Sequence, residues 1–131
     1  MDYAMTVRTA ASFAEANARV REALKAQGFG VLTEIDVQAT LREKLGEEIE
    51  QYIILGACNP PLASRALSAD RAIGLLLPCN VVVRAAGDAT IVEALDPRAI
   101  AEIAGQPLLK EIAEDAAARL RAALGALPPG R

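Results

Sequence analysis

Residues 52–67 read YIILGACNPPLASRAL and join a predicted strand directly to a predicted helix. The first half of this stretch is apolar and rich in residues that favour β-structure, which is typical of a central strand. Asn59 then stands where a helix needs an N-cap, and the prolines at the next two positions suit a first helical turn. The stretch therefore predicts a strand that ends at Cys58 and a short helix that begins after Asn59.

The Cys-Asn pair of this stretch returns in LLLPCNVVV, residues 75–83. Cys58 and Cys79 are the only cysteines of the chain, and both pairs lie beside proline. Residues 74–84 have the composition of a buried strand, but Pro78 cannot donate a hydrogen bond to a ladder. We expect residues 78–80 to form a bulge that divides the strand into 74–77 and 81–84, with the Asn80 amide satisfying unpaired backbone groups.

The remaining helices and strands are predicted from the spacing of the hydrophobic residues and from residues that cap helices. Ser12 and Glu15 form a capping box ahead of an amphipathic helix, and Gly87-Asp88 is a hairpin turn. We expect strands at residues 3–8, 29–36 and 90–95, of which 29–36 is half-buried. Long helices are expected at 13–27 and 108–124, and short helices at 36–45 and after Asp96. Middle strands and terminal helices predict an α+β fold, with both long helices on one face of an antiparallel-rich sheet. A second subunit or a ligand would cover the other face.

Length and composition narrow the protein class. With 131 residues we expect one domain over residues 1–127 and a flexible tail over 128–131. The net charge of −3 and the 3% aromatic content argue against nucleic acid as a partner. The uncharged apolar run at residues 72–83 is too short to span a membrane, and the N-terminus lacks a signal-peptide core. We therefore expect a cytoplasmic protein whose cysteines are thiols.

Several catalytic classes are excluded by the residues themselves. The chain has no histidine, so neither a Ser-His-Asp triad nor a Cys-His pair can form. It also has no Gly-rich phosphate-binding loop of the Walker or dinucleotide kind. The catalytic residues of any enzymatic activity stay unknown, and we favour a binding or structural function over catalysis.

YIILGACNPPLASRAL followed by DRAIGLLLPCNVVV, residues 70–83, resembles the core signature of the bacterial and archaeal family catalogued as domain of unknown function 302. The resemblance extends along the whole chain in the order and spacing of its elements. It implies a β-α-β(4)-α fold like that of the TATA-binding-protein halves, with a curved sheet, two main helices and short extra helices in the connections. It also implies a homodimer. No activity, cofactor or catalytic residue comes with it.

The two Cys-Asn pairs allow three interpretations. In the first, Gly56, Asn59, Pro78 and Asn80 are folding devices, and the cysteines are small buried apolar residues. In the second, Cys58 and Cys79 form a thiol-based redox site or bind a soft metal ion such as monovalent copper, and the four other residues support that site. A helix N-terminus beside Cys58 would favour its thiolate.

The third interpretation is a binding module. Aliphatic strands can line a cleft for a small apolar ligand, either between the sheet and the helices or at the dimer seam. Sequence spacing does not decide whether the two cysteines share one site.

Overall fold

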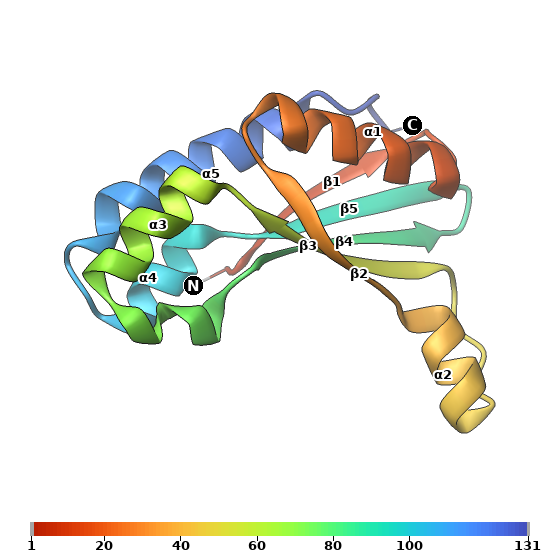
Figure 1. Ribbon diagram of the computed structural model, residues 1–131. Coiled ribbons are helices and arrows are strands. Elements are labelled where there is room, and N and C mark those ends of the chain that lie inside the picture. Colours follow the sequence, from red (N-terminus) through yellow and green to blue (C-terminus); the bar gives the residue numbers. More distant parts are fainter. Residues whose placement is uncertain (1, 131) are drawn as a thin grey trace.

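The fold is a five-stranded antiparallel sheet with helices on one face and at one end, seen in a computed structural model that describes residues 2–130 (Figure 1). The strands are β1 (Ala4–Thr9), β2 (Gly30–Asp36), β3 (Tyr52–Cys58), β4 (Cys79–Ala86) and β5 (Ala89–Leu95). The helices are α1 (Phe13–Ala26), α2 (Val37–Leu45), α3 (Pro60–Ala69), the 3₁₀ helix η1 (Arg71–Leu76), α4 (Pro97–Ala104) and α5 (Leu109–Gly125). The strand order across the sheet is β1-β5-β4-β3-β2. The predicted α+β class and the β-α-β(4)-α order are thereby confirmed.

Helices α1 and α5 cover one face of the sheet and enclose the main core (Figure 1). The Ser12 hydroxyl accepts a hydrogen bond from the Glu15 amide, which starts α1 as the capping box predicts. Successive strand residues point to opposite faces, so alternate positions of β3, β4 and β5 meet the helices. The fully buried side chains at this contact are Val20 and Leu24 of α1, Leu120 of α5, and Leu55, Val81, Val83 and Val92 of the sheet.

A smaller core lies at the end of the sheet where α3, η1 and α4 gather (Figure 1). Its buried members are Ala66, Ile73, Cys79, Ile100 and Leu109, from five different elements. Asn59 caps α3 and Asp96 caps α4, so each helix starts directly where a strand ends. This end of the molecule therefore combines three short helices with the start of α5.

The predicted strand at residues 74–77 is wrong, because residues 74–76 form the second half of η1 and Leu77 is its C-cap. The Asp70 carboxylate accepts a hydrogen bond from the Ala72 amide and starts the turn. Ile73 is buried and Leu75 is 87% exposed, so the apolar run does not have two buried faces. The bulge predicted at 78–80 is also absent: Leu77-Pro78 is a cis peptide, and β4 pairs regularly with β3 from Cys79 onward.

Strand β2 is more exposed than the half-buried strand that its alternation predicts. It is an edge strand, and of its seven residues only Val31 is half-buried. Leu32 is 68% exposed and lies at a register shift in the pairing with β3. Since α1 and α5 lie over the other strands, little of the chain's own structure is left to cover β2.

The second face of the sheet carries no described helix (Figure 1). One row across it pairs Ile35 with Ile54, Ile54 with Val82, and Val82 with Glu93. Ile54 and Val82 are only half-buried, and Ile35 is 50% exposed. We call this surface the open face.

Helix α2 extends away from the body of the molecule and has no buried residue (Figure 1). Asp36 caps α2 and Gly46, in the left-handed conformation, ends it, so the short helix predicted at 36–45 is confirmed.

The chain after α5 returns toward β1. Leu127 is buried, and the Ala10 amide donates a hydrogen bond to the Pro129 carbonyl oxygen over 3.3 Å. The flexible tail expected at 128–131 stays a prediction, and its last residue lies outside the described part of the chain. Within residues 2–130, no helix combines the length and the apolar character that crossing a bilayer would need.

Candidate ligand cavity

An apolar cavity of about 420 Å³ lies between the end of the sheet and helices α3, η1, α4 and α5. Its lining includes Phe29, Leu62, Ile73, Ile100, Leu109 and Ile112. No lysine, arginine, aspartate or glutamate is among the described residues that line it. A wall of this kind favours a ligand whose enclosed part is uncharged and apolar.

Both cysteines line this cavity. Cys58 is the last residue of β3, is half-buried and carries a free thiol. Gly30 of β2 is its partner across the sheet. The mouth of the cavity lies nearby, because Leu32 and Thr33 of the same edge strand line it and are exposed.

Cys79 is the first residue of β4 and is only 9% exposed. Burial raises the pKa of the Cys79 thiol to about 11, with a smaller contribution from the nearby Cys58. No hydrogen bond from residues 2–130 offsets this effect of burial on the pKa. Cys79 is therefore a neutral thiol at physiological pH.

The pairing of β3 with β4 determines how the two cysteines face each other. Cys79 lies opposite Ala57, so these two residues share one face of the sheet. Cys58 is one position further along and starts on the opposite face. Both cysteines nevertheless line the same cavity. Among residues 2–130, no group of three or more cysteine, aspartate or glutamate side chains is placed to hold a metal ion.

Asn59 connects α3 to the end of α1. Its side-chain oxygen accepts a hydrogen bond from the Leu62 amide, and its side-chain nitrogen donates to the Gln27 carbonyl oxygen over 3.4 Å. Gly28 has a positive φ of 85°, and a side chain there would meet the Asn59 amide at 2.9 Å. The predicted N-cap is confirmed, and Asn59 lines the cavity with its polar atoms already used.

Gly56 leaves space that a side chain would occupy. A methyl group on Gly56 would overlap the Thr33 hydroxyl and lie 2.9 Å from the Pro78 ring. Thr33 and Pro78 both line the cavity. The glycine therefore allows a neighbouring edge strand and the Pro78 loop to close over β3 at the cavity mouth.

Asn80 does not belong to this site. It pairs with Gly56 in a regular ladder, and its exposed side chain does not line the cavity. The prediction that the Asn80 amide hydrogen-bonds unpaired backbone groups of a bulge is wrong, because the bulge is absent.

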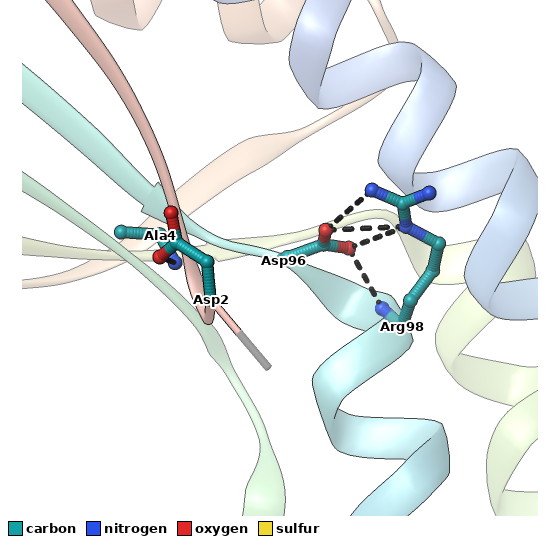
Figure 2. A network of polar contacts seen from close by, with 4 residues as sticks. All are labelled: Asp2, Ala4, Asp96 and Arg98. Atoms are coloured by element: carbon teal, nitrogen blue, oxygen red, sulfur yellow. Dashed lines mark hydrogen bonds and ion pairs between the residues drawn. The ribbon is translucent and has the colours of Figure 1, made fainter.

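A buried carboxylate fixes the start of α4, which forms one wall of the cavity. Figure 2 shows Asp96 accepting hydrogen bonds from the Arg98 amide over 2.9 Å and from the Arg98 guanidinium over 2.7 Å. These bonds, the Arg98 side chain first, lower the pKa of Asp96 despite its burial. The Asp96 amide also donates to the Tyr3 carbonyl oxygen over 2.8 Å, next to the Asp2–Ala4 turn of Figure 2. Pro97 and Ile100 are thereby held in the cavity wall.

The apolar lining residues were missed as site residues by sequence reasoning. Leu109 and Ile112 belong to a stripe that the periodicity of α5 predicts, but the same pattern describes any core helix. Ile73 and Ile100 come from segments too short to give a period. The sequence feature that could have indicated the cavity is the presence of short, capped helices close to the two cysteines.

The sequence profile of the family described as "Domain of unknown function DUF302" matches residues 5–127. The chain belongs to this family. It is also similar to a solved structure described as an uncharacterized conserved DUF302 protein from Bacillus stearothermophilus. The two are 35% identical and superpose with a TM-score of 0.89 over 95% of this chain and 98% of the other. A search of curated proteins found no match. Membership of the DUF302 family thus agrees with the fold and brings no activity.

Proposed function

We propose that this DUF302 protein binds a small, uncharged, apolar molecule in the cavity at the end of its sheet. The observation that carries the proposal is a cavity of about 420 Å³ whose described lining contains no charged side chain. Ligand sites of proteins typically measure about 300–1,000 Å³ and are mostly apolar.

The position of the cavity supports the same function. Its walls come from β2, β3, β4 and four helices, so a bound molecule would contact the smaller core at the end of the sheet. Apolar walls that face an unfilled space lose their dispersion partners, and an apolar ligand restores those contacts. Thr33 and Cys58 are the polar side chains at the exposed edge of the cavity. We infer that a ligand with one polar group places it there.

Apolar binding ranks ahead of the soft-metal and redox alternatives. A metal ion or a redox reaction at both thiols would have to displace the proton of Cys79, whose pKa is raised by burial to about 11. A metal ion would also find no third cysteine or carboxylate ligand among the described residues. The thiol site at Cys58 and Cys79 stays a prediction of the sequence.

Titration with the neutral fluorophore N-phenyl-1-naphthylamine tests this proposal. We expect saturable fluorescence enhancement by the wild-type protein. Ala63→Leu adds three carbons to the cavity wall from α3 and should weaken binding by about tenfold, or about 1.4 kcal/mol. Ala18→Leu makes the same change on the exposed surface of α1 and should leave the affinity unchanged. Equal affinities for the two variants, or no saturable binding, would contradict the proposal.

We further propose that two copies of the chain associate, as the sequence and the family resemblance lead us to expect. The open face carries the exposed or half-buried row Ile35, Ile54 and Val82, and α2 has no buried residue. A second copy covering both surfaces would remove apolar area from water. Light scattering should report two subunits for the wild type and one for Val82→Lys. A monomeric wild type would contradict this assembly.

A further inference from the structure

We propose that Cys58 is a site of reversible thiolation at the mouth of the cavity, where a small disulfide attaches and excludes the apolar ligand. The inference rests on the proposed function, because it names a regulation of the same cavity. Cys58 is half-buried, free and part of the lining, beside Thr33 and Leu32, which is 68% exposed. A reagent from solvent therefore reaches its sulfur through the same opening as a ligand.

A second feature of the cavity points to thiol chemistry there. Cys79 lines the same cavity and is 9% exposed, and no described residue donates a hydrogen bond that would offset the cost of ionising its thiol. Since the thiolate is the attacking species, Cys79 is both shielded and protonated at about pH 8, whereas the sulfur of Cys58 is accessible. The cavity thus holds one accessible and one protected thiol.

The arrangement of β3 and β4 favours a mixed disulfide over a bond between the two cysteines. A disulfide needs Cβ atoms about 3.8 Å apart that face each other. Cys79 shares its face of the sheet with Ala57, whereas Cys58 is the next residue and starts on the opposite face. Joining the two sulfurs would require a shift of the strand ends, which the pairing with β2 and β4 restrains.

The reaction is a thiol–disulfide exchange with a low-molecular-weight disulfide, R–S–S–R. The Cys58 thiolate attacks one sulfur, a new Cys58 S–S–R bond forms, and the R–S–S–R bond breaks. The electron pair leaves with the second sulfur as R–S⁻, which takes up the proton that Cys58 released. A free thiol reverses the exchange. No group other than the small disulfide is needed to balance it.

The test uses bis(2-hydroxyethyl) disulfide, a small uncharged reagent, at about pH 8. Intact mass and peptide mapping should show one hydroxyethylthio group on Cys58 of the folded wild type and none on Cys79. The modified protein should bind N-phenyl-1-naphthylamine at least about tenfold more weakly than the unmodified protein. Dithiothreitol should restore the original affinity, and saturation with the fluorophore should slow the labelling of Cys58.

Two variants distinguish the reaction of Cys58 from that of Cys79. Cys58→Ser should show no adduct and no change of its own fluorophore affinity on exposure to the reagent. Cys79→Ala should still be labelled at Cys58, and circular dichroism verifies that each variant is folded.

Three results would overturn the inference: first labelling of Cys79, loss of two hydrogens through a Cys58–Cys79 bond, or an adduct that leaves fluorophore affinity unchanged. Failure of the unmodified protein to bind the fluorophore would instead overturn the proposed function, so the two failures are distinguishable.

Discussion

The two Cys-Asn pairs have the same letters and opposite structural roles. In the first pair, Cys58 is half-buried and Asn59 is buried, with both polar groups of its amide hydrogen-bonded. In the second pair, Cys79 is buried and Asn80 is exposed in a regular ladder. The first pair ends a strand and starts a helix, whereas the second starts a strand after a cis proline. Identical dipeptides thus acquire their roles from the element on either side.

The largest expected difference between the two pairs is the effect of each cysteine on the free energy of unfolding at high pH. The folded-state pKa of Cys79 is about 11, whereas an unfolded cysteine ionises near pH 8.5. The proton is therefore bound more tightly by the folded state, so its stabilising effect is complete below about pH 8.5 and is lost as the pH rises to about 11. We expect this loss to be about 3 kcal/mol in the free energy of unfolding.

Urea unfolding of wild type and Cys79→Ala between pH 8 and 11 measures this effect, since other titrating groups cancel in the difference. Cys58→Ala is the matched control and should keep most of the wild-type pH dependence, because burial contributes more than Cys58 to the raised pKa of Cys79. The account of Cys79 fails if its alanine variant loses stability with pH as steeply as the wild type does.

The next largest effect is expected at Gly56, where the two motifs meet. Gly56 pairs with Asn80, and an added methyl group would overlap the Thr33 hydroxyl and press on Pro78. Gly56→Ala should lower the free energy of unfolding by about 1–3 kcal/mol and weaken fluorophore binding, because both neighbours line the cavity. Gly30→Ala, also in a strand, has no neighbour within 4 Å of the added atom and serves as control. Similar losses in both variants would show that space above β3 is not the cause.

The smallest expected difference is between the contributions of the two asparagines to the free energy of unfolding. Asn59→Ala removes the cap of α3 and the bond to Gln27, and should cost about 1–2 kcal/mol in chemical denaturation. Asn80→Ala removes an exposed side chain and should change the free energy of unfolding by less than about 0.5 kcal/mol. An Asn80 variant as unstable as the Asn59 variant would contradict the division of roles.

The sequence predicts the elements that local signals define. Ser12, Asp36, Asn59 and Asp96 each cap the helix that follows them, and the period of α1 and α5 identifies the residues that face the sheet. The same information does not place residues 74–77, because four consecutive apolar residues suit a buried strand and a short 3₁₀ turn equally. The Asp70 cap is the local signal that favours the turn.

The candidate site was only partly predictable. Composition and spacing mark Cys58, Asn59, Pro78 and Gly56. The first three line the cavity, and Gly56 lies next to the lining residues Thr33 and Pro78. Asn80 was included because its dipeptide repeats, although the ladder turns it to solvent. The lining from η1, α4 and α5 depends on long-range packing, which a single sequence does not encode as a local pattern.

The central claim is that the cavity, and not the open face, binds an uncharged apolar molecule. Isoleucine methyl groups report on both places, because Ile73, Ile100 and Ile112 line the cavity while Ile35 and Ile54 lie on the open face. In a methyl NMR titration with N-phenyl-1-naphthylamine, the account predicts saturable shifts at Ile73, Ile100 and Ile112 and unchanged signals from Ile35 and Ile54. Shifts confined to Ile35 and Ile54, or no saturable shift at any isoleucine, would contradict it.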